Sequence, residues 1–222
     1  MKVLALNSSP RMEKGNTALL LAPFLDGARE AGAEVDMVCV RRLDIKPCTG
    51  CFNCWNKTPG HCPQKDDMEQ LYAKLMSADV WVLATPLYEC GMTGTLKVLL
   101  DRTVACHHPG CEGEKPDKIV LVSSCGDYAL ERFNALLFYM KDLCGNIRKG
   151  KGCEFAGALL RPHAAAMKPM MDAGMPVGDI FSSARQAGIE LVKSGRMEPK
   201  TLENVGRPLC TRQEFEAVSG GK

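Results

Sequence analysis

The sequence lacks any block of like charge and any long apolar run. Its 28 basic and 26 acidic residues are interspersed and leave a formal net charge of +2, so no pattern indicates binding to nucleic acid or to an anionic membrane. No uninterrupted apolar stretch approaches the ~20 residues of a membrane span, and no charged leader with an apolar segment precedes residues 2–6. We therefore expect a cytoplasmic protein whose partners are small molecules or other proteins.

Two common nucleotide-binding motifs are also missing. The sequence contains neither G-x-G-x-x-G nor the Walker A lysine motif, which disfavours a dinucleotide-binding Rossmann site and an ATPase. No His and Asp pair stands out as an acid–base couple. That absence fits electron or hydride transfer but identifies no substrate.

The chain is long enough for one α/β domain, since 222 residues leave little room for a second large core. Short apolar runs, expected to be strands, alternate with helical patterns. The strands are expected at residues 3–6, 34–40, 80–84, 118–123 and 155–160. The helices are expected at residues 17–31, 67–77, 93–101, 128–143 and 177–194, the fourth ended by Gly145.

This alternation predicts a three-layer, doubly wound, five-stranded parallel sheet of the flavodoxin type, with strand order 2-1-3-4-5. We expect one such domain over residues 1–195. The tail, residues 196–222, shows no clear period and is expected to fray at its end, although Pro208 and Leu209 could pack on the body or on another subunit.

A cysteine-rich loop, residues 44–65, interrupts the pattern after the second strand. It holds Cys48, Cys51, Cys54 and Cys62, four thiols within fifteen positions. Structural zinc usually takes its thiols as two separated pairs, so this spacing favours an iron–sulfur centre over a single zinc ion. A loop this long is usually functional or disordered, and the cysteines favour a function.

Other cysteines have simpler interpretations. Cys39, Cys144 and Cys153 lie in or beside apolar segments and are expected to be buried as small hydrophobic residues. The group Cys106, His107, His108 and Cys111 could hold zinc or form a redox pair, but four adjacent ligands are strained around one ion, so a loop without metal is favoured. The segment from His163 to Met175 is interpreted as an interface or lid, with a solvent-facing loop as the alternative.

Two loops follow predicted strands on either side of the point where the strand order reverses. The loop Ser8–Thr17 brings hydroxyls, an amide, a guanidinium and a helix start together, as a phosphate monoester requires, while an ordinary N-cap at Asn16 or Thr17 is the alternative. The loop Thr85–Gly94 could hold a flat aromatic ring by its backbone amides, Tyr88 and its glycines, or could be a plain connection capped by Thr93.

Together these motifs resemble a known family. Ser9-Pro10-Arg11, Gly15-Asn16-Thr17, Thr85-Pro86-Leu87-Tyr88, Met92-Thr93-Gly94 and the run from Lys97 to Asp101-Arg102 are similar to the NADPH-dependent FMN reductase branch of the flavodoxin-like proteins. With the four loop cysteines added, the chain looks like the iron-sulfur flavoproteins of anaerobic prokaryotes. The resemblance runs from residue 1 to about residue 195.

The resemblance implies a set of roles. Ser9, Arg11, Asn16 and Thr17 would bind the FMN phosphate, the turn Ser124-Cys125-Gly126 would line the flavin ring, and so would the residues of the Thr85–Gly94 loop: Pro86, Leu87, Tyr88, Met92, Thr93 and Gly94. Cys48, Cys51, Cys54 and Cys62 would hold a [4Fe-4S] cluster that exchanges electrons with FMN, in a homodimer or homotetramer. Cys90 and Cys125 would lie beside the flavin, as packing residues or as groups that tune it.

The family also leaves alternatives open. The donor would be ferredoxin or NAD(P)H, and the acceptor a small molecule or a protein. A flavin-only NAD(P)H-dependent FMN or quinone reductase, with thiols that are vestigial or hold zinc, and a flavodoxin-like electron carrier are the competing functions. Because the carboxyl ends of parallel strands share one edge, cluster and flavin are expected on the same side of the sheet, within one subunit or across a dimer interface.

Overall fold

The computed structural model describes residues 1–108, 116–146 and 153–219. A parallel sheet in the order β2-β1-β3-β4-β5 forms its centre, which confirms the order predicted from sequence. Its strands are β1 (Lys2–Asn7), β2 (Glu34–Cys39), β3 (Val80–Pro86), β4 (Lys118–Ser124) and β5 (Glu154–Arg161). The direction of winding reverses between β1 and β3, so the loops after these two strands diverge and leave a crevice between them.

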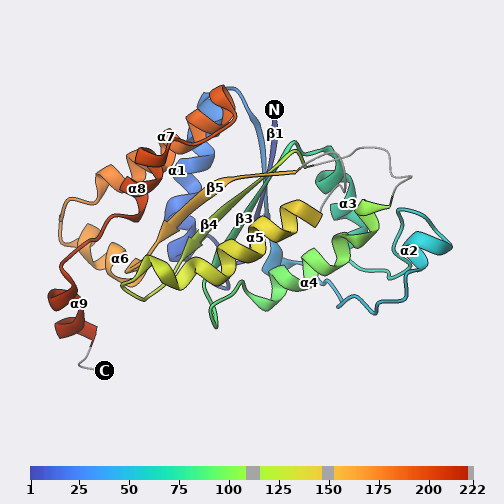
Figure 1. Cartoon of the computed structure of the whole chain (residues 1–222), viewed down its shortest axis with the longest axis horizontal. Helices are drawn as coiled ribbons and strands as arrows, with labels where there is room; N and C mark the ends of the chain where they lie inside the picture. The colour runs from blue at the N-terminus through green and yellow to red at the C-terminus, as the bar shows by residue number, and fades with distance from the viewer. Residues whose placement is uncertain (109–115, 147–152, 220–222) are drawn as a thin grey trace.

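Helices cover both faces of the sheet (Figure 1). One face carries α1 (Asn16–Glu30), α6 (Ala164–Asp172), α7 (Gly178–Ser194) and α8 (Pro199–Gly206), and the other carries α3 (Met68–Ser77), α4 (Gly94–Arg102) and α5 (Asn134–Asn146). The short α2 (Asn53–Asn56) lies in the cysteine-rich loop, and α9 (Arg212–Ser219) follows α8. Figure 1 places α2 and α6 at opposite ends of the molecule.

Alternate residues of each strand enter two separate cores. Val80, Val82 and Ala84 of β3 pack under α1 and α7, whereas Trp81 and Leu83 pack under α3, α4 and α5. All five side chains are at most 1% exposed. A strand with both faces covered by helices reads as a continuous apolar run, which is why the strands were recognisable from sequence.

Several helices were not predicted. Residues 164–172 form α6 instead of a loop, with Met167 fully buried, and the tail forms α8 and α9. Gly145 lies inside α5 instead of ending it, and the start of the helix expected at residue 128 is a 3-10 turn, Leu130–Phe133. The expected fraying at residues 220–222 falls outside the described part.

Tertiary contacts hold the tail in place. The buried Arg161 guanidinium at the end of β5 donates to the carbonyl oxygens of Val205 (2.7 Å) and Arg207 (2.6 Å). Leu209 packs against the core under α7, as expected for packing on the body. Such long-range contacts leave no period in the sequence of the tail itself. Among the described residues no helix is both long and apolar enough to cross a membrane.

Candidate functional site

A cleft lies at the carboxyl edge of the sheet, between the loops after β1, β3, β4 and β5. We call it the sheet-edge cleft. Its volume is about 160 Å³. The lining includes ten residues singled out from the sequence, namely Ser9, Arg11, Asn16, Thr17, Pro86, Leu87, Tyr88, Ser124, Cys125 and Gly126. Segments more than a hundred residues apart in sequence therefore meet at one site.

Asn7, the last residue of β1, organises the first loop. Its side-chain oxygen accepts from the Ser9 backbone N–H (3.0 Å), and its amide donates to the Met12 carbonyl (3.3 Å). Met12 adopts a positive φ of 48° inside this turn. The sequence analysis did not single out Asn7, although a polar residue closing an apolar strand was the available signal.

The start of α1 is left open toward the cleft. Gly15 is the N-cap instead of Asn16 or Thr17, and glycine has no side chain with which to cap the first turn. A Cβ at this position would lie 2.5 Å from the Ser9 hydroxyl oxygen, so glycine is needed for the close approach. The free N–H groups of a helix start, with the exposed Arg11 beside them, make an anion-binding surface.

Thr17 joins this surface to β4. Its hydroxyl lies 2.8 Å from the Ser124 hydroxyl, and both residues are buried. One hydroxyl of such a pair donates to the other, so the accepting hydroxyl keeps its proton for a third group. The pair can therefore hold two loops together and still offer one hydrogen bond to a ligand.

The loop after β3 forms a tight turn. Tyr88 and Gly91 exchange two backbone hydrogen bonds (2.9 and 2.8 Å), and the two residues between them, Glu89 and Cys90, have positive φ values of 47° and 62°. Residues other than glycine seldom adopt this backbone conformation, so the turn is strained. It holds Tyr88 at the cleft with 51% of its surface exposed.

Three predicted residues lie behind this turn. Met92, Thr93 and Gly94 are not part of the lining formed by the described residues. Thr93 is buried, and its backbone N–H donates to the Thr85 hydroxyl (3.0 Å). These residues connect the loop to α4 and support its position.

The turn after β4 is held by the start of α6. Ala164 N–H donates to the Cys125 carbonyl (2.9 Å), and Ala164 and Ala165 join the cleft lining, which the sequence analysis missed. Burial raises the pKa of the Cys125 thiol to about 11. Cys125 is therefore a protonated packing residue at neutral pH, while Cys90 is exposed.

His163 closes the other side of the same turn. Its ring stacks on Tyr128 (4.2 Å between centroids) and on Phe215 of α9 (5.0 Å), and Nε2 lies 2.9 Å from the Tyr128 carbonyl. Burial, the main cause, lowers the pKa of His163. A neutral ring in this stack ties the C-terminal helix to the cleft wall.

The four loop cysteines line a second hollow, which we call the cysteine cavity. Its volume is about 430 Å³, and its other walls come from the end of α4, the following turn Thr103–His107, and Tyr139 and Leu143 of α5. Trp55 of α2 fixes the loop by donating from Nε1 to the Val104 carbonyl (2.9 Å). No three His, Cys, Asp or Glu side chains of the described ranges lie close enough to hold a single metal ion.

The cysteine thiols differ in environment. Cys51 is exposed, and a hydrogen bond from the Asn53 backbone, assisted by the Thr49 hydroxyl, lowers its thiol pKa. Cys54 is buried, and its pKa is raised by burial first and then by the negative charges of Cys62, Cys48 and Cys51. Cys54 therefore lies within electrostatic range of the other three loop thiols.

The neighbouring group Cys106 to Cys111 is only partly described. Cys111 lies outside the described residues. His107 lines the cysteine cavity, and burial lowers its pKa. Its Nε2 is 3.4 Å from the Thr103 hydroxyl.

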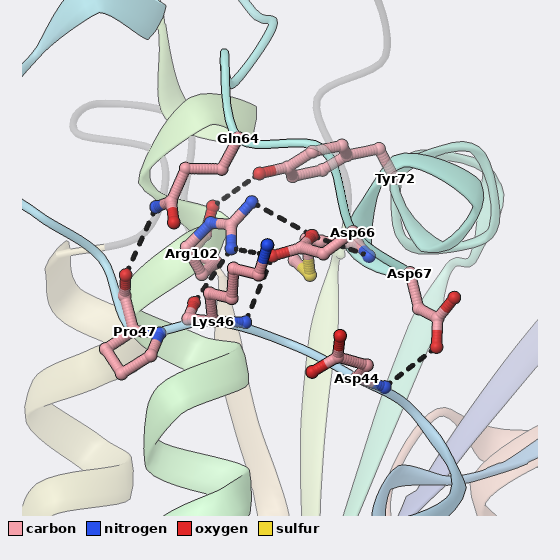
Figure 2. Close-up of polar contacts among 9 residues, drawn as sticks. Asp44, Lys46, Pro47, Gln64, Asp66, Asp67, Tyr72 and Arg102 are labelled. Atoms are coloured by element: carbon pink, nitrogen blue, oxygen red, sulfur yellow. Dashed lines mark hydrogen bonds and ion pairs between the residues drawn. The ribbon is translucent and has the colours of Figure 1, made fainter.

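A buried ion pair closes the base of the cysteine-rich loop (Figure 2). Arg102, at the end of α4, donates from Nη1 to Asp66 (2.6 Å) and to the Lys46 carbonyl (2.8 Å), so it binds both ends of the loop. The side chains of Arg102 and Asp66 are 1% and 0% exposed. Burial, the largest single effect, raises the pKa of Asp66, but the hydrogen bond from Arg102, the backbone hydrogen bonds from Lys46 and Met68 and the charge of Arg102 together outweigh it, so the pKa is lowered. No local sequence pattern predicts this pair.

The cleft and the cavity lie toward opposite ends of α4. The residues Pro86–Tyr88 precede this helix and line the cleft, whereas its last residues, 100–102, line the cavity. A helix of 9 residues is about 14 Å long. The two sites were expected at one edge of the sheet, but Arg102 fastens the loop to the far end of α4. Within one chain they are separated by roughly this helix.

Known proteins similar to this chain include iron-sulfur flavoproteins and a quinone oxidoreductase. The NADPH-dependent FMN reductase family model matches residues 1–139. An iron-sulfur flavoprotein of Methanocaldococcus jannaschii is 38% identical over 103 residues, 46% of this chain and 52% of that protein. One from Archaeoglobus fulgidus is also 38% identical over 103 residues, 46% of this chain and 49% of that protein. The chain thus spans about half the length of the curated relatives it matches.

A solved structure supports the fold. An NAD(P)H:quinone oxidoreductase from Methanothermobacter marburgensis superposes with a TM-score of 0.63 over 86% of this chain and 96% of that one, at 19% identity. At this identity the likeness concerns the architecture of the sheet and its helices.

Proposed function

Because the chain belongs to the NADPH-dependent FMN reductase family, we propose that it is an FMN-dependent oxidoreductase whose cysteine cavity holds a [4Fe-4S] cluster that exchanges electrons with the flavin. The observation that carries the proposal is the meeting of ten predicted residues in one cleft at the β1/β3 reversal. FMN, when bound, supplies transfer of one or two electrons.

The cleft residues fit the phosphate and one edge of the ring. The open start of α1 and the hydroxyls of Ser9 and Thr17 would donate to the phosphate, and Arg11 would balance its charge. Gly15 leaves the space that the Ser9 hydroxyl occupies. Leu87 and Tyr88 would pack against the ring.

The cysteine cavity fits a polynuclear centre. A tetrahedral zinc site would draw its sulfurs to about 3.8 Å from one another, whereas the four cysteines here line one side of a cavity of about 430 Å³. Cys48, Cys51, Cys54 and Cys62 would be the ligands. A [4Fe-4S] cluster, when bound, supplies single-electron transfer.

A second copy of the chain would complete the flavin site. The cleft measures about 160 Å³, well below the roughly 300 Å³ at which cofactor pockets begin, and Tyr88 beside it is half exposed. We therefore propose a homodimer or homotetramer in which a neighbour covers the ring. Light scattering at micromolar concentration checks this, and a monomer with full FMN occupancy would contradict it.

Anaerobic purification tests the two cofactors together. We expect one FMN per chain, released by acid and identified by its absorption, and about four irons and four labile sulfides. If the purified protein contains no FMN and does not bind added FMN, the oxidoreductase proposal is overturned. Ferredoxin and NAD(P)H are the donors to compare.

The same preparation separates the alternatives. FMN with turnover but without iron would favour a flavin-only NAD(P)H-dependent FMN or quinone reductase. FMN that is reduced and reoxidised by protein partners, without steady-state turnover of any small acceptor, would favour a flavodoxin-like carrier.

A further inference from the structure

Arg102 has one polar atom that its known partners leave unused. Its Nε has no hydrogen-bond partner among the described residues. Because the side chain is only 1% exposed, solvent does not reach this N–H either. Buried donors are almost always satisfied, so an unsatisfied one calls for an explanation. Arg102 also lines the cysteine cavity, together with all four loop cysteines.

The other donors of Arg102 bind the base of the loop. Nη1 reaches Asp66 and the Lys46 carbonyl, and Nη2 reaches the second Asp66 oxygen (3.2 Å). Asp66 in turn accepts from the Lys46 backbone N–H (3.0 Å), as Figure 2 shows. The planar fork of an arginine can make these contacts at once, which a lysine cannot.

Two further contacts join the two ends of the cysteine-rich loop, residues 44–47 and 64–67. The Asp44 backbone N–H donates to Asp67 (2.8 Å), and the Gln64 amide donates to the Pro47 carbonyl (3.1 Å). Both of these lie in exposed surroundings, whereas the Arg102 contacts are buried. Arg102 therefore connects the base of the loop to the domain, through α4, by buried contacts.

We propose that Arg102 is a positioning residue for the metal centre: it closes the cysteine-rich loop through Lys46 and Asp66, and presents its remaining N–H and its positive charge to the sulfur ligands around the cavity. This inference rests on the proposed [4Fe-4S] function. A buried cation beside a cluster stabilises the reduced form, which carries one more negative charge, and so raises the reduction potential.

The test uses full-length protein, reconstituted anaerobically with ferrous iron and sulfide. Arg102→Gln removes the charge and the fork, and Asp66→Asn removes the ion pair but keeps the arginine. Lys65→Gln is the matched control, because it removes a positive charge from the same segment at an exposed pair with Glu69. FMN binding reports folding, since the cleft shares no lining residue with the cavity in the described ranges.

Three quantities are measured. We expect Arg102→Gln to lower iron affinity about 10- to 100-fold, as the loss of an outer-shell partner does, and to speed proteolysis of the metal-free loop between residues 47 and 63. The cluster that still forms should have a more negative midpoint potential. Asp66→Asn should lower iron affinity, but the midpoint potential of its residual cluster should lie at or above that of wild type, because the arginine charge remains and the neighbouring negative charge is gone. Lys65→Gln should match wild type throughout.

The outcomes separate this inference from the function it rests on. Wild type that takes up no iron overturns both. If wild type and Arg102→Gln take up iron with equal affinity and their clusters have the same midpoint potential, only the role of Arg102 is overturned. Lower iron affinity with an unchanged potential overturns the electrostatic half. If Arg102→Gln fails to bind FMN because Asp66 is left as a buried unpaired charge, the double variant with Asp66→Asn replaces it. Its iron affinity and midpoint potential are then compared with those of Asp66→Asn, so that the two proteins differ only at Arg102.

Discussion

The sheet-edge cleft and the cysteine cavity are built in different ways. The cleft is assembled from the ends of four strands, and buried hydrogen bonds such as those of Asn7 and the pair Thr17–Ser124 hold its loops. The cavity lies between a single loop, which a buried ion pair fastens to the end of α4, and its other walls, which come from α4, the Thr103–His107 turn and α5. One site is part of the sheet, and the other is attached to it.

The thiols in the two sites show what this difference does. Burial raises the pKa of Cys125 in the cleft to about 11, so the thiol stays protonated. In the loop, backbone and hydroxyl donors lower the pKa of the exposed Cys51. The cleft therefore keeps its cysteine in the unreactive protonated form, whereas the loop favours the thiolate of Cys51, the form that reacts with alkylating agents and binds metal.

The largest expected effect is the loss of metal in Cys51→Ser. Removing one of four ligands should reduce iron from about four per chain to below one, while FMN stays bound because the cleft is separate. Iron and flavin analysis on the same anaerobic sample measures this. Cys90→Ser, a change at an exposed cysteine outside the cavity, is the control and should keep its iron. Equal iron in both variants would mean that the loop is not the metal site.

The contrast between the thiols can be measured directly by alkylation. At pH 7 in metal-free protein, Cys51 should react at least about 100-fold faster than Cys125, because reactivity follows the thiolate fraction. Since the pKa of Cys125 is about 11, its rate should rise about tenfold per pH unit up to that value. Peptide mapping after iodoacetamide treatment gives both rates, and similar rates at pH 7 would contradict the contrast.

In the cleft, Arg11→Ala should weaken FMN about 10- to 100-fold, because a charge-assisted contact contributes roughly 1.5 to 3 kcal/mol. Riboflavin, which lacks the phosphate, should bind poorly to wild type. Lys14→Ala is the control, since Lys14 is an exposed cation in the same loop that does not line the cleft among the described residues. Equal wild-type affinity for FMN and riboflavin would refute the phosphate assignment.

The smallest effect is expected from Gly15→Ala. The new Cβ would lie 2.5 Å from the Ser9 hydroxyl oxygen, so the hydroxyl must move and FMN affinity should fall by a factor of about 5, the loss of one ordinary hydrogen bond. Gly145→Ala, where no atom lies within 4 Å of the added Cβ, should leave FMN affinity unchanged. Fluorescence titration with FMN compares them, and identical affinities would show that the space at Gly15 is not used.

Local patterns were enough for the sheet and for most of the cleft. Strands such as β3 are apolar throughout because both faces are covered, so their positions are visible in sequence. The strand order determines that the loops after β1 and β3 meet at one crevice, whereas the Ser124 turn was assigned to the same site from the resemblance to the family. The cysteine spacing predicted that four thiols gather around one centre, since neighbours in a short loop cannot lie far apart, and all four line the cysteine cavity.

Other features depend on contacts that no local pattern records. The helices α6, α8 and α9 were not predicted from the sequence, and Arg161 holds the tail through backbone carbonyls, which every residue carries. Arg102 and Asp66 are separated by 36 positions, and either could have been an ordinary surface charge. The sequence alone determined which strands form, in what order they pair and which loops carry the chemistry. Only the tertiary structure decided where the cysteine-rich loop is fastened, because a buried ion pair depends on two segments meeting in space and on the exclusion of water around them.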